Sequence, residues 1–272
     1  MSRIFLLISM LAVAACQPPS DPGGADAPSA SVAPAPGAEV GALPSLAERL
    51  ADRPEADRAR DAGRMPAEVV EFLGIEEGMT VLDVFSAGGW YAEVLSHAVG
   101  PAGTVYAQNT EFLLSMRDGA NEKAMAARLA DGRLPNVQRL DRELDDLGLA
   151  PGSVDAAMLA LNFHDIYNRG GPDGALAFLG RIYSLLKPGG VLGLIDHHGA
   201  AGNDNAALHR VEKAKVLEVI DASDFVLEGE SDLLVNPDDD MTSMVFAPEI
   251  RGRTSRFLLR LRKPADATAV GP

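Results

Sequence analysis

The strongest constraint on the fold is an alternation of short apolar runs with longer helical patterns, which extends from about residue 66 to residue 264. Five apolar runs have the length of strands, at 80–85, 104–108, 137–140, 154–159 and 191–196. Helical patterns lie between or after them, at 91–99, 112–130, 175–186 and 207–222, and two last strands follow at 225–230 and 257–262. Strands that alternate with helices pair in parallel. The pattern therefore predicts one α/β domain over 66–264, with five βα steps and two final strands in a doubly wound, seven-stranded sheet.

The first residues have the features of a bacterial lipoprotein signal. Residues 4–15 form an apolar run that is too short to span a bilayer but has the length of a signal-peptide core. The run ends Val13-Ala14-Ala15-Cys16, which resembles the lipobox of bacterial lipoproteins. The resemblance implies a signal peptide over 1–15 and lipidation of Cys16, and a plain secretory signal with a chance cysteine is the alternative. These features predict an exported protein that is lipid-anchored in the cell envelope. Because the residue after the cysteine is Gln17 and not the aspartate that resembles an inner-membrane retention signal, we expect the periplasmic face of the outer membrane.

The segment after the cysteine is predicted to be a tether. Residues 16–44 are rich in Pro, Ala, Gly and Ser, and such a stretch cannot bury enough apolar surface to offset the entropy lost on ordering. Short helices are expected at 46–50 and 54–61, which makes 45–65 an N-terminal helical extension of the domain. Residues 265–272 are predicted to be a disordered tail.

The chain is acidic, with 39 Asp and Glu residues against 24 Lys and Arg residues and a formal net charge of −15. Nucleic-acid binding needs a basic stripe that faces the phosphates, whereas the basic residues of this chain are scattered among the acidic ones. We therefore expect no nucleic-acid partner and no membrane contact apart from the lipid anchor. The single cysteine excludes an intramolecular disulfide and a thiolate metal site.

A glycine turn stands where the first predicted strand gives way to a helix. The segment reads Asp83-Val84-Phe85-Ser86-Ala87-Gly88-Gly89-Trp90. Ligands of doubly wound sheets bind at the carboxyl ends of the strands, and free N–H groups at a helix start favour polar or anionic groups. The turn predicts a site for a nucleotide-like ligand; glycines that only tighten the turn are the alternative.

Three segments give the chain a resemblance to class I S-adenosylmethionine-dependent methyltransferases. The sequence Leu185-Leu186-Lys187-Pro188-Gly189-Gly190-Val191-Leu192 is similar to the turn before their fifth strand. Asp83 with Gly88-Gly89 resembles their first motif, and Ser153-Val154-Asp155 resembles the opening of their fourth strand. Segments 52–66 and 162–165 also resemble a bacterial group of exported predicted methyltransferases. The resemblance covers about 45–264 and implies a Rossmann-like sheet with S-adenosylmethionine as the cofactor.

The resemblance also implies which residues bind the cofactor. Asp83 would orient the glycine loop or bind the methionine amine, and the ribose would lie at the end of the second strand. The other residues implied are Ser86, Ala87, Gly88 and Gly89 for the methionine part, Gln108 and Asn109 for the ribose, and Asp141 or Glu143 for the adenine edge. The sequence departs from the family in two ways. Gln108-Asn109 replaces the usual acidic residue, and neutral acceptors bind hydroxyls more weakly; Phe85 and Ala87 replace frequent glycines.

Histidines follow the fourth and fifth predicted strands, which should end at the edge of the sheet that carries the glycine turn. The segments are Asn162-Phe163-His164-Asp165 and Asp196-His197-His198. Histidine accepts protons near neutral pH, so His164 is a candidate general base with Asp165 or Asp196 orienting it. His197 is a further catalytic candidate, although adjacent strand-end residues diverge, so at most one of His197 and His198 should face the cleft. A purely structural histidine is the alternative in each case.

Aspartate and two histidines around one cleft could bind a divalent ion, but no metal site is expected, because the acidic residues and histidines of this edge lack a diagnostic ligand spacing. The run Asp238-Asp239-Asp240 lacks the glycine and the ligand steps of a calcium loop. It is therefore predicted to be a solvated turn.

The sequence favours an enzyme that transfers a methyl group from S-adenosylmethionine to a small molecule or a protein. The alternative is a non-catalytic envelope lipoprotein that binds another ligand in the same cleft, and the loss of the ribose acid favours it. A nicotinamide oxidoreductase is disfavoured, because the first turn lacks the G-x-G-x-x-G spacing and the acidic residue about 20 residues further on. The oligomeric state stays open.

Overall fold

A computed structural model describes residues 44–265 of the chain. The predicted signal peptide, Cys16, the tether up to residue 43 and the tail from residue 266 lie outside the described residues. Within 44–265, no helix combines the length and the apolar character needed to cross a bilayer.

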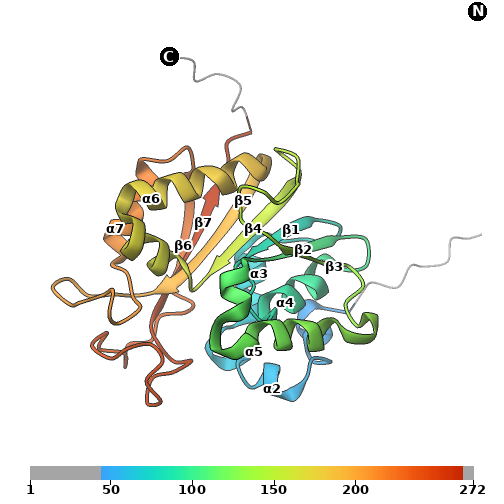
Figure 1. Cartoon of the computed structure of the whole chain (residues 1–272), viewed down its shortest axis with the longest axis horizontal. Helices are drawn as coiled ribbons and strands as arrows, with labels where there is room; N and C mark the ends of the chain where they lie inside the picture. Colours follow the sequence, from blue (N-terminus) through green and yellow to red (C-terminus); the bar gives the residue numbers. More distant parts are fainter. Residues whose placement is uncertain (1–43, 266–272) are drawn as a thin grey trace, which may run out of the picture. The chain divides into compact units, whose positions relative to one another are not determined.

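A seven-stranded sheet forms the centre of the described residues, in the order β3-β2-β1-β4-β5-β7-β6 (Figure 1). The strands are β1 Thr80–Val84, β2 Thr104–Asn109, β3 Val137–Asp141, β4 Val154–Ala160, β5 Leu186–His197, β6 Val226–Ser231 and β7 Arg256–Arg262. The pairs among β1 to β5 are parallel, and β7 is antiparallel to both β5 and β6. The predicted doubly wound α/β class is confirmed, and the order reverses between β1 and β4, where such sheets bind ligands.

The helices cover the sheet on both faces, with α3, α4 and α5 on one side and α6 and α7 on the other (Figure 1). The helices are α1 Leu46–Leu50, α2 Glu55–Arg58, α3 Pro66–Leu73, α4 Trp90–Val99, α5 Glu111–Leu129, α6 Phe163–Leu185 and α7 Lys213–Asp221. Two 3₁₀ turns, η1 Asp61–Gly63 and η2 Ala130–Gly132, also lie within residues 44–265. Pro66 starts α3 and Gly74, with φ of 68°, ends it, as expected for a proline that lacks a donor and a glycine that accepts a left-handed conformation.

Two apolar cores lie on the opposite faces of the sheet. Val81 belongs to the core under α3 and α4, whereas its neighbour Leu82 belongs to the core under α6 and α7. Ala156 and Ala157 of β4 divide in the same way. Successive side chains of a strand point to opposite faces, so a strand buried on both faces reads as one continuous apolar run.

The connections differ from the prediction at three places. Strand β3 is joined to β4 by residues 142–153 without a helix, which agrees with the predicted elements, so the predicted count of five βα steps was wrong and four are present. Helix α6 begins at Phe163, well before the predicted residue 175, and bends at Gly171, where φ is 64°. Helix α7 begins at Lys213 rather than at 207, because residues 205–209 form a turn and Val211 forms a parallel bridge with His198.

The N-terminal extension is attached to the domain by an ion network. The carboxylate of Asp57 in α2 accepts hydrogen bonds from both terminal nitrogens of Arg128 in α5, at 2.8 and 3.0 Å. Arg128 also pairs with the fully buried Glu93 of α4. Since a buried carboxylate needs compensating charge, this network fixes residues 55–63 beside the start of α4.

Candidate functional site

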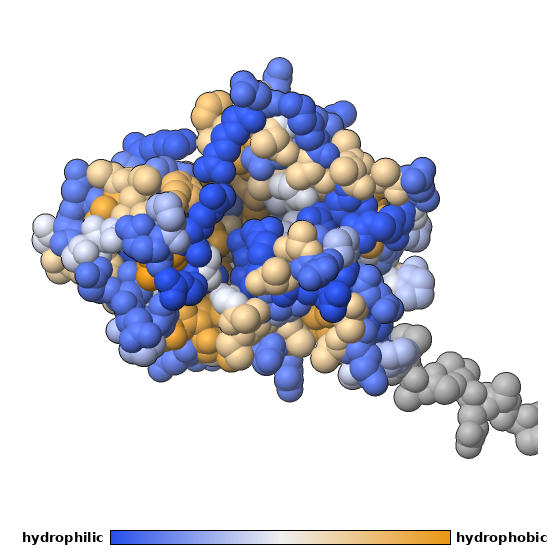
Figure 2. Space-filling view, turned by 90° about the horizontal axis from the view of Figure 1, so that it is seen from below, coloured by the Kyte–Doolittle hydropathy of each residue, from blue (hydrophilic) through white to orange (hydrophobic). Residues whose placement is uncertain are grey.

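A cavity of about 590 Å³, which we call the central cavity, opens at the edge where the parallel strands end. Its walls come from the glycine turn, the starts of α5 and α6, the end of β5 and the N-terminal extension. The surface at this edge is hollowed near its centre, with hydrophilic side chains on both flanks (Figure 2). The sheet thus brings the predicted turn and the predicted histidines to one cavity.

The glycine turn begins with two residues in left-handed conformations. Phe85 has φ of 54° and Ala87 has φ of 51°, and Gly89 follows with φ of 79°. Non-glycine residues adopt such angles at a cost of roughly 1–2 kcal/mol, so the surrounding structure must hold the turn in place.

Gln108 and Asn109, at the end of β2, hold that turn. Gln108 Oε1 accepts the N–H group of Phe85 at 3.0 Å, and its Nε2 donates to the carbonyl of Arg142. Asn109 Oδ1 accepts the N–H group of Ala87 at 2.7 Å, and its Nδ2 donates to the carbonyl of the same residue. Both side chains are 0% exposed. Their polar atoms therefore face the backbone of the turn, and their role as ribose ligands stays a prediction.

Gly88 and Gly89 are required by packing against α5. A Cβ atom on Gly88 would lie 2.8 Å from the Cβ atom of Ala124. One on Gly89 would lie 3.0 Å from Met125 and from Arg128. The glycines therefore let α5 approach the turn, and Arg128 Nε donates to the carbonyl of Gly88 at 2.9 Å.

Asp83 and two arginines make the floor of the central cavity polar. Ser86 Oγ donates to Asp83 Oδ2 at 2.5 Å, and burial raises the pKa of Asp83 to about 7. The guanidinium groups of Arg60 and Arg64 lie 5.4 and 4.6 Å from the ring centre of Trp90. Burial, with the charge of Arg64, lowers the pKa of Arg60 to about 10, so Arg60 is cationic at neutral pH. Arg64 is cationic because a guanidinium group keeps its proton in proteins.

An apolar groove of about 520 Å³ adjoins the central cavity. Its apolar lining residues are Phe85, Phe112, Leu113, Met116, Ile166, Ala177 and Phe178. The rings of Phe85 and Phe178 stack with centres 5.5 Å apart. The Phe85 side chain therefore borders both the groove and the central cavity.

His164 and Asp196 form a buried pair at the wall of the central cavity. The backbone N–H group of His164 donates to Asp196 Oδ2 at 2.7 Å, and its Nδ1 lies 2.8 Å from Asp196 Oδ1. Because a carboxylate only accepts, Nδ1 carries a proton and Nε2 of the neutral ring has the lone pair. Burial acts to lower the pKa of His164, but the Asp196 carboxylate raises it above its usual value. A basic nitrogen thus faces the cavity.

Asp165 and His209 lie beside that nitrogen. The distance from Asp165 Oδ2 to His164 Nε2 is 3.7 Å, and that from Asp165 Oδ1 to His209 Nδ1 is 3.6 Å. His209 precedes α7 in a left-handed conformation with φ of 54°. The sequence pattern placed His209 inside a helix, so only the delayed start of α7 brings its ring to the cavity.

His197 and His198 diverge as expected, and only His197 lines the central cavity. Its Nδ1 lies 2.7 Å from Thr254 Oγ1, and burial lowers its pKa to about 3. His198 instead contacts Ser255 Oγ and packs against Phe257. His197 is therefore neutral and a poor proton acceptor, which makes His164 the stronger of the two predicted bases.

Asp141 is not among the residues that line the central cavity or the apolar groove. Its carboxylate pairs with Arg139 at 2.8 Å. Conversely, Arg60 and Arg64 line the central cavity without having been predicted as site residues, although both lie in the segment 52–66 that carries the family resemblance.

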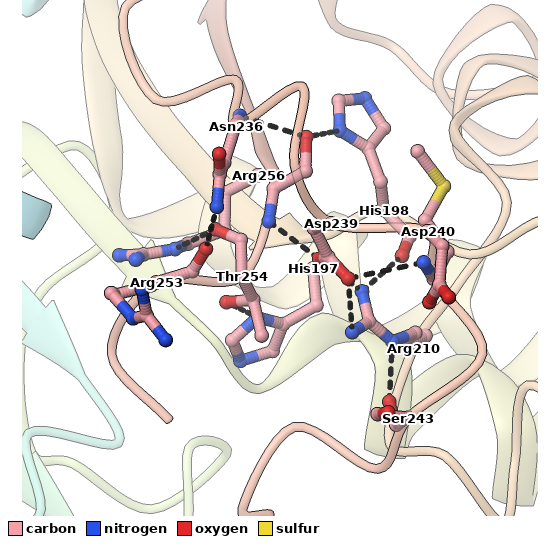
Figure 3. A network of polar contacts seen from close by, with 12 residues as sticks. His197, His198, Arg210, Asn236, Asp239, Asp240, Ser243, Arg253, Thr254 and Arg256 are labelled. Atoms are coloured by element: carbon pink, nitrogen blue, oxygen red, sulfur yellow. Dashed lines mark hydrogen bonds and ion pairs between the residues drawn. The ribbon is translucent and has the colours of Figure 1, made fainter. Parts of the chain in front are cut away.

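A second polar network lies next to His197 and His198 and includes Arg210 and Asp239 (Figure 3). The guanidinium group of Arg210, 0% exposed, donates to both carboxylate oxygens of Asp239 at 2.9 and 3.0 Å. Asp239 also accepts the N–H group of Ser255 at 2.7 Å. The prediction of a solvated turn is wrong for Asp239, because the buried cation of Arg210 needs its charge. This pair fixes the loop that carries His209.

The residues present fit part of an S-adenosylmethionine molecule. Asp83 suits the methionine amine, the cations Arg60 and Arg64 suit the carboxylate, and the stacked Phe85 and Phe178 suit a flat ring. At the end of β2, however, the expected ribose acceptors are turned inward. The cavity thus fits the two ends of the cofactor, while the ribose would need other partners.

The fold is shared with methyltransferases of known structure. No family model matches the chain, and no curated protein does. A SAM-dependent methyltransferase from Aquifex aeolicus superposes with a TM-score of 0.55 at 20% identity, over 80% of this chain and 97% of the other. The [4+2]-cyclase SpnF superposes with a TM-score of 0.55 at 19% identity, over 75% and 81% of the chains. The chain therefore has the fold of the SAM-dependent methyltransferases, and one of these neighbours is named for another reaction.

Proposed function

We propose that the protein is an S-adenosylmethionine-dependent methyltransferase whose acceptor loses a proton to His164. The observation that carries the proposal is the His164–Asp196 pair, which presents a basic nitrogen to the same cavity as Asp83 and the glycine turn. The fold supports it only as an analogy, since one fold hosts many reactions.

Each residue has a defined task in this reaction. Asp83, Arg60 and Arg64 would hold the charged end of the cofactor, which supplies an electrophilic methyl group when bound. Nε2 of His164 accepts the proton of an acceptor hydroxyl or amine, and Asp196 stabilises the imidazolium that results. Positioning of the acceptor supplies most of the rate enhancement in such a transfer.

The acceptor, a small molecule or a protein group, reaches His164 through the apolar groove and the central cavity. Both spaces are bordered by Asn162, Asp165 and Arg169, so a ligand that fills the groove also touches the wall near His164. We also propose that the protein acts in the cell envelope, where the lipobox-like segment ending in Cys16 would anchor it.

A second candidate is a non-catalytic lipoprotein that binds another ligand. The inward-turned Gln108 and Asn109 favour it, because they remove the usual ribose contacts. The discriminating feature is His164: a binding protein has no need of a proton acceptor with a raised pKa.

Transfer of a labelled methyl group tests the main proposal. The purified protein is incubated with methyl-tritiated S-adenosylmethionine and an extract of bacterial small molecules and envelope proteins, and labelled products are counted. We expect labelling by the native protein and at least a hundredfold less by His164→Ala, at unchanged cofactor affinity. Equal labelling by the two proteins contradicts the role of His164, and its absence in both favours the binding protein.

A further inference from the structure

Three side chains at the wall of the central cavity have the composition of a transition-metal site. His164, Asp165 and His209 each place one potential ligand atom within 4.8 Å of the others. The separations that involve Asp165 are 3.7 and 3.6 Å. These two separations go to different oxygens of Asp165, and a tetrahedral ion with bonds of about 2.1 Å holds its ligand atoms about 3.4 Å apart, so side-chain rotations would have to bring one Asp165 oxygen near both imidazoles.

His164 is oriented as metal-binding histidines usually are. Its Nδ1 donates to the buried carboxylate of Asp196 at 2.8 Å, which fixes the ring and leaves Nε2 towards Asp165. A histidine that binds a metal almost always donates its other ring N–H to such a partner. The backbone N–H group of His164 also donates to this carboxylate, so the position of the His164–Asp196 pair is fixed by the backbone as well as by the ring.

The ring of His209 is also held on two sides. It lies edge-on to the ring of His164 with centres 5.6 Å apart, and Phe246 lies at 5.1 Å. The loop that carries it is fixed by the buried Arg210–Asp239 pair. Arg169 Nη2 lies 3.4 Å from Asp165 Oδ1. Its side chain is 68% exposed, so it can turn into solvent when Asp165 binds an ion.

We propose that His164, Asp165 and His209 bind one divalent first-row transition ion, such as Zn²⁺. Two imidazoles and one carboxylate suit such ions, whereas Mg²⁺ and Ca²⁺ prefer oxygen ligands alone. Because all three residues line the central cavity, the remaining coordination position faces the cavity and is open to water or an acceptor oxygen. An ion bound there takes the lone pair of His164, so His164 can accept a proton only in the metal-free form of the protein, and metal binding would inhibit the proposed methyl transfer.

Metal binding by the full-length, untagged protein tests the inference without any need for methyl transfer. Zn²⁺ and Co²⁺ are added to the protein at neutral pH, and bound metal is counted after equilibrium dialysis, with Mg²⁺ as a comparison. We expect one Zn²⁺ per chain at micromolar concentration and visible d–d absorption with Co²⁺. Failure of the proposed methyltransferase activity leaves this result unaffected.

Matched variants locate the ion. His209→Asn keeps a residue type that tolerates the left-handed backbone, and Asp165→Asn keeps the side-chain shape; each should weaken Zn²⁺ binding at least tenfold. His97→Gln removes an imidazole on α4, outside the cavity lining, and should change nothing. No stoichiometric binding by the native protein, or binding that both cavity variants leave intact, overturns the proposal.

Discussion

Asn109 holds both polar backbone groups of Ala87, accepting from its N–H at 2.7 Å and donating to its carbonyl at 3.2 Å. The Asn109 side chain thus makes the two hydrogen bonds that a neighbouring strand would make with Ala87. A left-handed alanine is stable only when its surroundings fix it, and Asn109 is wholly buried. The strand-end position that would bind a ribose instead maintains the shape of the turn.

Asn109→Ala should therefore lower the free energy of unfolding by about 1–3 kcal/mol, because it removes two hydrogen bonds to the half-buried Ala87 at about 0.5–1.5 kcal/mol each. Urea denaturation measures the change. If Asn109 were instead a ribose ligand, the variant would lose cofactor affinity at unchanged stability, and that outcome contradicts a structural role for Asn109 in the turn.

Gly89 and Gly78 form a matched pair for the packing of α5 on the turn. They have φ of 79° and 81°, but a Cβ on Gly89 meets Met125 and Arg128 at 3.0 Å whereas one on Gly78 meets open space. Gly78→Ala should cost about 1–2 kcal/mol from backbone strain alone. Gly89→Ala should cost about 1–3 kcal/mol more from overpacking, as measured by thermal or urea unfolding; equal losses would show that α5 does not press on the turn.

The titration of His164 should differ from that of His197. Asp196 raises the pKa of His164 above about 6.5, the usual value, and burial lowers that of His197 to about 3. NMR of the imidazole carbons should show His164 titrating above pH 6.5, and Asp196→Asn should move it to lower pH. His197 should not titrate between pH 5 and 9.

The same shift of His164 sets the sign of its contribution to stability. A pKa raised on folding contributes stability that is full below about pH 6.5 and is lost as pH rises through the folded value. His164→Gln should therefore destabilise the protein more at pH 6 than at pH 9. A titration of His164 below pH 6 contradicts both expectations.

The Arg210–Asp239 pair should matter far more than a surface pair. Asp239→Asn leaves a buried guanidinium without a counter-charge, which costs about 3–5 kcal/mol. The control is Glu230→Gln, which breaks a pair with Lys213 whose side chains are 39% and 35% exposed, and should cost about 1 kcal/mol or less. Comparable losses in the two variants would place Asp239 in solvent.

The sequence predicted the strands within one or two residues where apolar runs are bounded by turn residues. β5 is the exception, because it begins at Leu186, five residues before the predicted start. The pattern could not show that Leu186-Lys187-Pro188-Gly189-Gly190 continues the strand, since those residues are typical of a turn.

The site was predicted in its location but not in its details. Strand order brings His164 and the glycine turn to one edge, and that follows from the α/β pattern. The direction of Asn109, the burial of Arg210 and the arrival of His209 depend on contacts between residues far apart in the chain. Periodicity carries no information about such contacts. The helix predicted over 207–222 therefore gave no sign that His209 lies beside His164 and Asp165.

Binding of the cofactor tests the proposed methyltransferase function most directly. S-adenosylmethionine and S-adenosylhomocysteine are titrated into the purified full-length protein in a calorimeter, with folding checked by circular dichroism. We predict one site per chain with dissociation constants of about 1–100 µM, or about −8.2 to −5.5 kcal/mol. A folded protein that binds neither compound at millimolar concentration would contradict the methyltransferase function.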